Sequence, residues 1–300
     1  MYEKILVPLD GSELAQLALP YAEELAAAFG SEIRLLYVSD VARDAGRRMH
    51  RMYLEKMSDG VKRAAMKHGT KAEVSVSGVI QSGRPADEII EYADREDIGL
   101  IIMATHGRSG ISRWAMGSVA DKVVRGTSRP VALIRAKGQQ PQPGAKAIIE
   151  RILVPLDGSK EGEAVLPYAR EIASKLKASL SLLQTVDVGY SAMAAEGAEF
   201  LLYSEPQLAS FKQYAGTYLR QVAAGLKEHG IDVTTVVRTG RAADEIVRYT
   251  EEQHTDLVAM STHGRSGVGR FVFGSVAEKV LYEGNTPLFL VRVKLPGLSK

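Results

Sequence analysis

The chain has 300 residues, which suggests two domains of about 150 residues, each long enough to bury its own core. Hydrophobic residues make up 45% of the chain and charged residues 25%, the composition of an ordinary globular protein. The net charge of +2 gives no reason to expect a nucleic-acid-binding surface or a patch for anionic membranes. The absence of cysteine excludes disulfides, thiolate metal sites and a cysteine nucleophile.

The N-terminal segment MYEKILVPLD has no basic region followed by a long hydrophobic stretch, so we expect no signal peptide. No apolar stretch approaches the roughly 18–20 residues that a membrane-spanning helix needs. Together with the absence of cysteine, these features favour a cytoplasmic protein.

Two long segments of the sequence occur twice. The segment Lys4–Ser12 (KILVPLDGS) returns as Arg151–Ser159 (RILVPLDGS). The segment Met103–Lys122 (MATHGRSGISRWAMGSVADK) returns as Met260–Lys279 (MSTHGRSGVGRFVFGSVAEK). Repetition on this scale indicates two copies of one domain in tandem.

The seam between the copies is Ala136–Ala147, AKGQQPQPGAKA. It is rich in Gly, Gln and Pro and has no hydrophobic periodicity, which is typical of a surface linker. We therefore predict one domain at 1–137, a linker at 138–147 and a second domain at 148–300.

Short apolar runs alternate with helical patterns within each copy. A helix that starts near Ser12 should be kinked by Pro20, as its counterpart should be by Pro167, and should end at Gly30. In the first copy we predict strands at Ile5–Leu9, Ile33–Val38, Ala72–Val79, Leu100–Met103 and Pro130–Ile134, and further helices at Arg43–His68, Arg84–Arg95 and Ser118–Arg125. This βαβαβαβαβ order predicts an α/β fold of two doubly wound five-stranded parallel sheets, with helices on both faces.

In such sheets ligands bind beyond the carboxyl ends of the strands, where the winding reverses. Two segments of the first copy follow those ends, the turn Pro8–Ser12 and the loop Ala104–Ser118. The loop is Gly-rich and ends at a predicted helix start, where unpaired N–H groups and the helix dipole favour a phosphate, and Arg108 would add a donor. It lacks the Gly-Lys-Ser/Thr ending of a P-loop. From the residues alone, anion binding and an ordinary Gly-rich loop remain alternatives.

Structural interpretations also exist for the aspartate and histidine of these segments. Asp10 precedes Gly11-Ser12, and Asp-Gly-Ser is ordinary turn and cap chemistry. His106 and His263 directly follow a buried strand, which favours hydrogen-bonded structural side chains over catalysts. No nearby Ser-His-Asp order or metal-ligand spacing points the other way.

Both copies resemble the universal stress protein family over nearly the whole chain apart from the linker. Nucleotide-binding members of that family carry Gly-x2-Gly-x9-Gly-(Ser/Thr) after the fourth strand and an aspartate at the end of the first. Gly107 with Gly117-Ser118, and Gly264 with Gly274-Ser275, fit the second and third glycines. The first glycine is replaced by Ala104 in one copy and by Ser261 in the other. The resemblance implies a Rossmann-like fold similar to that of adenine nucleotide alpha hydrolases.

The resemblance also implies roles for individual residues. Asp10 and Asp157 would meet the ribose hydroxyls, with Pro8 and Pro155 beside them. The adenine edge would meet the backbone of Val38 and Thr185, with Met103 and Met260 near the adenine or ribose. The phosphates would be held by Gly107, Gly117, Ser118 and Val119, and by Gly264, Gly274, Ser275 and Val276. The loop residues Ala104, His106 and Arg108, and Ser261, His263 and Arg265, complete the two candidate sites.

These features predict a stress-response regulator that binds ATP, ADP or AMP at two similar sites. Any Mg²⁺ would be held by phosphate oxygens and waters, because no carboxylate cluster accompanies the loop, and no catalytic or metal-ligating residue is assigned. Two alternatives stay open. A bound ATP beside Asp10 and His106 would make the protein a slow hydrolase, or the fold would serve as a protein-interaction module without nucleotide, as the changes at Ala104 and Ser261 suggest.

The resemblance further implies that the copies pair as an internal pseudo-dimer through their fifth strands, Val131–Ile134 and Leu288–Val291. Both runs are apolar, so an unpaired edge there would be unfavourable. Pairing of whole chains into a homodimer and an unidentified protein partner stay open, and no nucleic acid or membrane partner is expected.

The second copy carries about ten extra residues between Asp187 and Thr239. The stretch Tyr190–Tyr218 within it is dense in aromatic residues. It is interpreted either as a longer amphipathic helix that packs on the neighbouring domain, or as a lid or partner surface near the second site.

Overall fold

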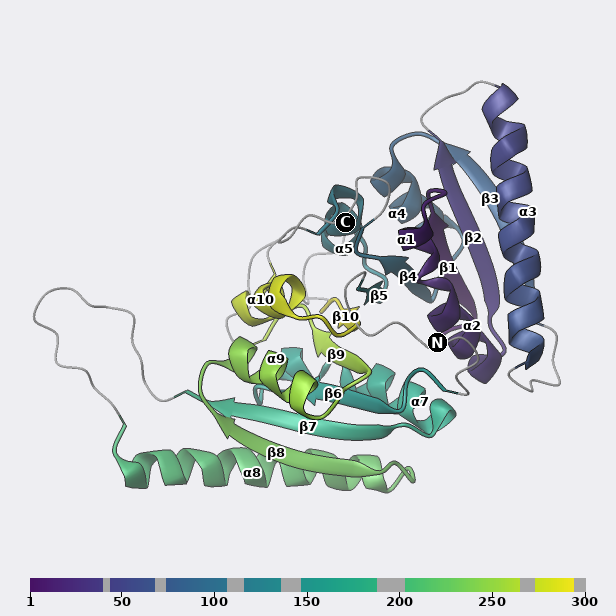
Figure 1. Cartoon of the computed structure of the whole chain (residues 1–300). Helices are drawn as coiled ribbons and strands as arrows, with labels where there is room; N and C mark the ends of the chain where they lie inside the picture. The colour runs from purple at the N-terminus through teal and green to yellow at the C-terminus, as the bar shows by residue number, and fades with distance from the viewer. Residues whose placement is uncertain are drawn as a thin grey trace, which may run out of the picture.

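A computed structural model describes residues 1–39, 44–67, 74–106, 116–135, 147–187, 203–264 and 273–293. The predicted linker, apart from its last residue, lies outside the described residues, as does much of each Gly-rich loop. Figure 1 shows two similar α/β units that meet along one shared sheet.

Each unit repeats the same order of strands and helices. The first contains β1 (Lys4–Leu9), α1 (Glu13–Gln16), α2 (Leu19–Phe29), β2 (Glu32–Ser39), α3 (Asp44–Lys67), β3 (Val76–Ser82), α4 (Pro85–Arg95), β4 (Leu100–Ala104), α5 (Ser118–Gly126) and β5 (Val131–Ile134). The second contains β6 (Arg151–Pro155), α6 (Lys160–Glu163), α7 (Leu166–Leu176), β7 (Ser179–Val186), α8 (Glu205–Lys227), β8 (Val233–Thr239), α9 (Ala242–Glu252), β9 (Leu257–Ser261), α10 (Ser275–Glu283) and β10 (Leu288–Val291).

The strands form one ten-stranded sheet in the order β3-β2-β1-β4-β5-β10-β9-β6-β7-β8. Within each unit the strands are parallel, and the order reverses direction between β1 and β4 and between β6 and β9. The units join where β5 and β10 pair antiparallel, with Ala132 opposite Phe289. The predicted α/β class with two repeated, doubly wound sheets is confirmed.

Two hydrophobic cores cover the two faces of this sheet. One face is packed by α2, α3, α7 and α8, and its core runs through both units. The other face is packed by α4, α5, α9 and α10. Central strand residues such as Ile5, Leu6 and Val7 are fully buried, because a parallel strand between two helical layers exposes neither face.

The helix after the first strand is broken rather than kinked. It divides into α1 and α2, with Pro20 in the first turn of α2, and Pro167 takes the same place in α7. Proline lacks an N–H group, so it fits a first turn, where that group has no partner within the helix. Gly30 ends α2 in the left-handed conformation (φ 70°), whereas Lys177 takes this conformation at the end of α7 (φ 57°).

Polar contacts also join the two units beside the paired strands. Arg125 on α5 contacts Glu278 on α10 at 3.3 Å, and the Tyr282 hydroxyl donates to Asp121 at 3.3 Å. On the other face, the Glu24 carboxylate accepts the N–H group of Ile148 at 2.6 Å, just before β6. Burial raises the pKa of the Glu24 carboxyl, although this backbone hydrogen bond opposes the change.

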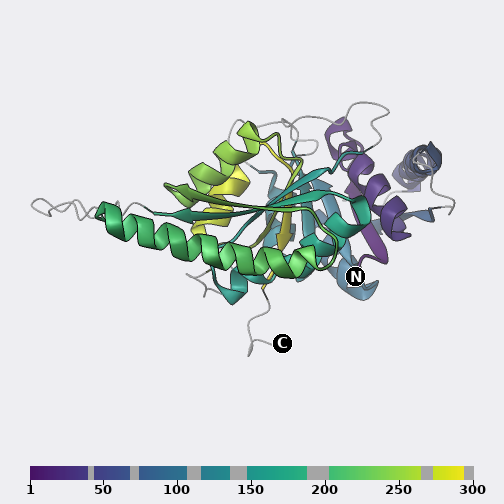
Figure 2. The same cartoon turned by 90° about the horizontal axis from the view of Figure 1, so that it is seen from below.

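Helix α8 packs on β7 and β8 of its own unit, so the predicted packing on the neighbouring domain is wrong. Figure 2 shows it lying lengthwise across that sheet. It has 23 residues against 24 in α3, so the extra residues of the second copy do not lengthen the helix. They precede it, and 188–202 lie outside the described residues.

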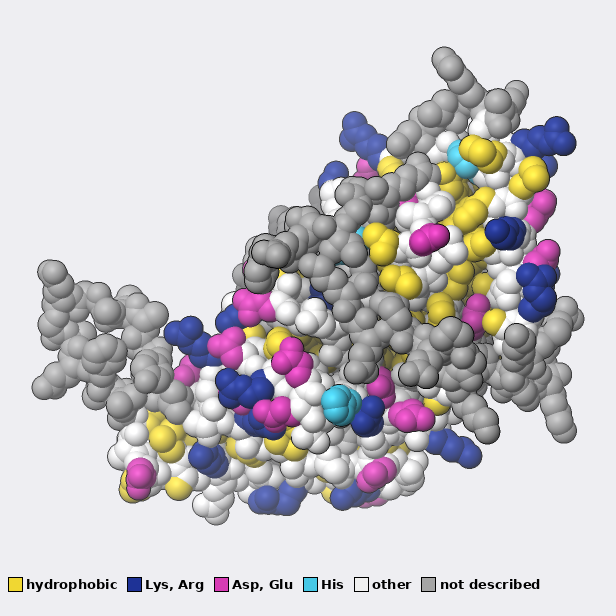
Figure 3. All heavy atoms as spheres, viewed as in Figure 1, with side chains coloured by type: hydrophobic (Ala, Val, Ile, Leu, Met, Phe, Trp, Pro, Cys, Tyr) yellow, Lys and Arg dark blue, Asp and Glu magenta, His cyan; other side chains and the backbone are white. Residues whose placement is uncertain are grey.

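The surface of the second unit carries charges of both signs. On the face shown in Figure 3, Lys and Arg side chains are interspersed with Asp and Glu. Within the described part of the chain, each helix is too short or too polar to cross a membrane.

Candidate functional site

The turn that contains Asp10 follows β1, and a turn with the same hydrogen bonds follows β6. Asp10 accepts the N–H group of Ser12 at 3.0 Å and its hydroxyl at 2.6 Å, and the Ser12 Oγ accepts the N–H group of Ala15 at 3.1 Å. Serine is therefore the helix cap, and the aspartate orients it. Asp157 and Ser159 form the same bonds at 3.0 and 2.6 Å.

Glycine is required between the aspartate and the serine. Gly11 has φ 89° and Gly158 has φ 81°, in a region that other residues rarely adopt. The turn thereby brings each carboxylate to the carboxyl end of the central strands.

Replacing Ser12 with alanine should lower the free energy of unfolding by about 1 kcal/mol, because α1 loses its only side-chain cap. Urea unfolding followed by circular dichroism measures this change. Ser118→Ala is the matched control, because the start of α5 has no side-chain cap hydrogen bond, and it should change stability by less than about 0.5 kcal/mol. Equal losses in both variants would contradict this account of the Ser12 cap.

A backbone hydrogen bond joins the residues just after β4 to the residue just before α5, and the second unit repeats it. The Gly117 N–H group donates to the Thr105 carbonyl at 2.8 Å, and Gly274 donates to Thr262 at 2.9 Å. In both units this places a helix start, with no side-chain cap, beside the end of the fourth strand. The unpaired first-turn N–H groups and the helix dipole suit an anion there.

Ala104 and Ser261, which stand where the glycine motif has its first glycine, adopt ordinary backbone conformations. Neither Ala104 nor Ser261 has a positive φ, so the backbone here does not need glycine. The Ser261 hydroxyl donates to the Gly162 carbonyl at 3.1 Å and ties α6 to the end of β9. Ala104 cannot form this bond, so the two sites differ at this position.

His106 and His263 each form a hydrogen bond with the side chain of the threonine that precedes them. Thr105 Oγ1 and His106 Nδ1 are 3.0 Å apart, and Thr262 Oγ1 and His263 Nδ1 are 3.0 Å apart. A histidine bound to its neighbour's hydroxyl fits the structural interpretation of these residues. Among the described residues, no group of three or more His, Asp or Glu side chains could hold a metal ion.

Each unit encloses a cavity at the point where its strand order reverses. The cavity of the first unit has a volume of about 310 Å³ and that of the second about 260 Å³, close to the lower end of the range for small-molecule sites, roughly 300–1,000 Å³. Among the predicted site residues, those that line the first are Pro8, Asp10, Val38, Met103, Ala104, His106, Gly117, Ser118 and Val119. Those that line the second are Pro155, Asp157, Thr185, Met260, Ser261, His263, Gly264, Gly274, Ser275 and Val276. Gly107, Arg108 and Arg265 lie outside the described residues.

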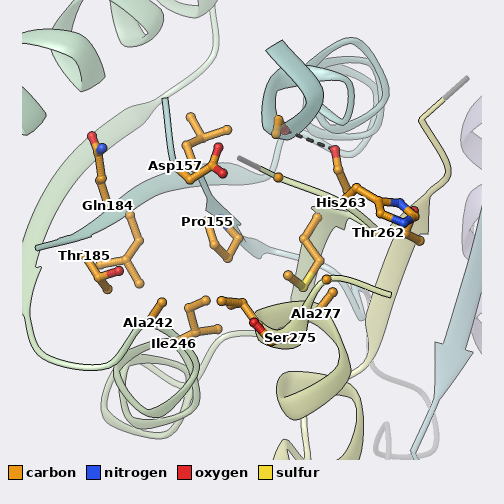
Figure 4. A pocket seen from close by; sticks show the side chains of 18 residues that line it. Pro155, Asp157, Gln184, Thr185, Ala242, Ile246, Thr262, His263, Ser275 and Ala277 are labelled. Atoms are coloured by element: carbon orange, nitrogen blue, oxygen red, sulfur yellow. Dashed lines mark hydrogen bonds between the residues drawn. The ribbon is translucent and has the colours of Figure 1, made fainter. Parts of the chain in front are cut away.

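The sequence patterns did not identify the apolar walls or three polar lining residues, Thr105, Thr262 and Gln184. In the first unit Leu36, Pro85 and Ile89 also line the cavity. In the second, Leu183, Gln184, Ala242 and Ile246 do so. Figure 4 shows Asp157 and Gln184 on one side of this cavity and Ala242, Ile246 and Ser275 on the other. Periodicity marks such residues only as buried, and their place beside the cavity depends on how α4 and α9 pack.

Comparison with known proteins agrees with this architecture. A model of the universal stress protein family matches residues 1–135 and 149–292. A universal stress protein of Methanocaldococcus jannaschii is 31% identical over 141 residues, which cover 45% of this chain and 83% of that protein. A universal stress protein of Synechocystis sp. is 24% identical over 97% of this chain and 100% of its own length.

A similar double-unit fold occurs among solved structures. The crystal structure of a universal stress protein from Archaeoglobus fulgidus aligns with a TM-score of 0.68 and 20% identity. The alignment covers 97% of this chain and 99% of that one. At this identity the likeness establishes the fold alone.

Proposed function

Because the chain belongs to the universal stress protein family, we propose that it binds an adenine nucleotide, with ATP foremost, in each of its two cavities and acts as a stress-response regulator. The observation that carries the proposal is a pair of cavities, each with an aspartate turn and an uncapped helix start on its lining. Carboxylates accept hydrogen bonds from ribose hydroxyls, and helix N-termini attract phosphates.

In this proposal the roles of the two units are parallel. Asp10 and Asp157 accept from the ribose hydroxyls, and the first turns of α5 and α10 donate N–H groups to the phosphates. The apolar walls, for example Ile89 and Ile246, contact the base. A bound Mg²⁺ would be held by the phosphates and waters. The described lining of each cavity contains a single carboxylate, which is too few for a metal site built from the protein alone.

The proposal is tested by denaturing the purified protein and identifying the released small molecules by mass. We expect about two moles of adenine nucleotide per chain. About one mole would indicate one competent site, and Gly117→Val and Gly264→Ala would identify which. If no nucleotide is released and calorimetry detects no binding of ATP with Mg²⁺, the proposal is wrong, and a protein-interaction module becomes the better interpretation.

A further inference from the structure

A charged groove runs along the outer edge of the first unit, between α3 and β3. β3 is the end strand of the sheet, and α3 lies beside it at the margin of the unit (Figure 1). The groove has a volume of about 740 Å³. The helix packs closely on the middle of the strand, because a Cβ atom added to Gly78 would lie 3.0 Å from that of Leu54.

The outer edge of β3 presents unpaired backbone groups. The Ile33 N–H group donates to the Ser75 carbonyl, so the odd-numbered residues of this strand face β2. The even-numbered residues, for example Ile80, therefore turn their N–H and carbonyl groups away from β2. Within the described part of the chain, no strand pairs with this edge. An open edge of this kind is a template for a strand of another chain.

Four exposed charges line the helix side of the groove. They follow one another at intervals of four residues, two positive and then two negative: Arg47, Arg51, Glu55 and Asp59. Residues four apart form one ridge on a helix surface. None of the four is ion-paired with another described residue, so the ridge is available to charges from outside the chain.

The order of these charges is complementary to that of a second copy of the helix. When two copies lie antiparallel about a twofold axis level with Tyr53, Arg47 of each chain faces Asp59 of the other. Arg51 of each chain then faces Glu55 of the other. Each contact occurs twice, so four ion pairs form across the axis.

The strand places the axis at the same level. Leu54, next to Tyr53 on the helix, lies against Gly78, near the middle of β3 (Val76–Ser82). Two copies of β3 that pair antiparallel over their full length have their axis at that middle. The helix charges and the strand edge therefore agree on one placement of a second copy.

The opposite edge of the sheet lacks this complementarity. Its end strand is β8, and α8 meets this strand at Gly216, where an added Cβ atom would lie 4.0 Å from Val237. Four residues to either side of Gly216 are Lys212 and Arg220, both positive. An antiparallel copy of α8 would bring these like charges together, which is unfavourable.

We propose that the groove between α3 and β3 is the interface of a homodimer, in which the two copies of β3 pair antiparallel and the two copies of α3 form the four ion pairs. Met52, which is 62% exposed, lies near the axis and becomes covered. The same arrangement joins the units within one chain, where β5 pairs antiparallel with β10 and Arg125 contacts Glu278 beside them. The interface does not depend on nucleotide binding.

Sedimentation equilibrium of the full chain over a concentration series tests this interface. We expect a dimer whose dissociation constant rises with salt, because its ion pairs lie at the surface. Arg51→Glu should raise this constant at least about tenfold, because both contacts with Glu55 change from attraction to repulsion. Arg51→Glu combined with Glu55→Arg exchanges the charges and should return the constant to within about threefold of the original.

A matched control on α8 and a local measurement locate the interface. Lys212→Glu, a charge reversal beside the opposite edge, should leave the dissociation constant unchanged, and circular dichroism checks that each variant is folded. Amide hydrogen exchange over 76–82 should be slower in the dimer than in Arg51→Glu. A chain that stays monomeric throughout the series would overturn the inference. So would a dimer that Arg51→Glu does not weaken, or a double variant as weak as Arg51→Glu.

Discussion

Replacing Phe289 with alanine should lower the free energy of unfolding by about 3–5 kcal/mol. Phe289 is fully buried on β10, where this strand pairs with β5 of the other unit. Its ring lies 6.4 Å from that of Tyr2 in the first unit and 6.2 Å from that of Tyr168 in the second. The residue opposite is Ala132, which is too small to fill the space that the ring would leave. Urea unfolding followed by circular dichroism measures the loss.

A second substitution, at the equivalent position of the other copy, should restore stability to this variant. Ala132 and Phe289 occupy equivalent positions of the two copies, so Ala132→Phe combined with Phe289→Ala keeps the total volume and reverses its placement. We expect the double variant to regain at least half of the lost stability, because volume-conserving changes in a core are tolerated better than cavities. A loss below about 1.5 kcal/mol for Phe289→Ala would show that this cluster does not hold the units together.

The ends of the predicted elements show what local sequence patterns determine. Helices 84–95 and 118–125 were predicted within about one residue of the observed α4 and α5, because turn residues precede both. The strand predicted at 72–79 is observed at 76–82 instead. Its pairing partner, β2, sets that register, from Ile33 opposite Val76 to Ser39 opposite Ser82. A long-range partner of this kind is not encoded in local alternation.

The residues of the candidate site also fall into two groups, those that local sequence patterns predict and those that depend on long-range packing. The residues at the strand ends and the helix starts were found because the repeat marks turns and because the family motif is local in sequence. Gln184 and Ile246 were missed, although both line the second cavity. Gln184 is an ordinary strand residue by pattern, and its burial follows from the packing of α8 and α9 against β7.

Gly264→Ala should remove nucleotide binding at the second site, with a loss in affinity of at least about tenfold. Gly264 lies against the Asp157 carboxylate, and a methyl group there would overlap the Asp157 Oδ2 atom. Asp157 is held from its other side by Ser159, so it cannot move away without breaking that bond. The bonds to the Ser159 N–H group and hydroxyl therefore oppose a shift of the carboxylate away from the new methyl group.

The matched control is Gly274→Ala, the same change in the same loop. Its new methyl group would lie 3.5 Å from the Thr262 carbonyl oxygen, an ordinary contact, so binding should change by less than about threefold. Released nucleotide should fall from about two moles per chain to about one in Gly264→Ala and stay near two in Gly274→Ala. If both variants kept two moles, the Asp157 carboxylate could not be the group that holds the ribose. If both fell to one, the loop rather than the carboxylate would control binding, because Gly264 lies against Asp157 and Gly274 does not.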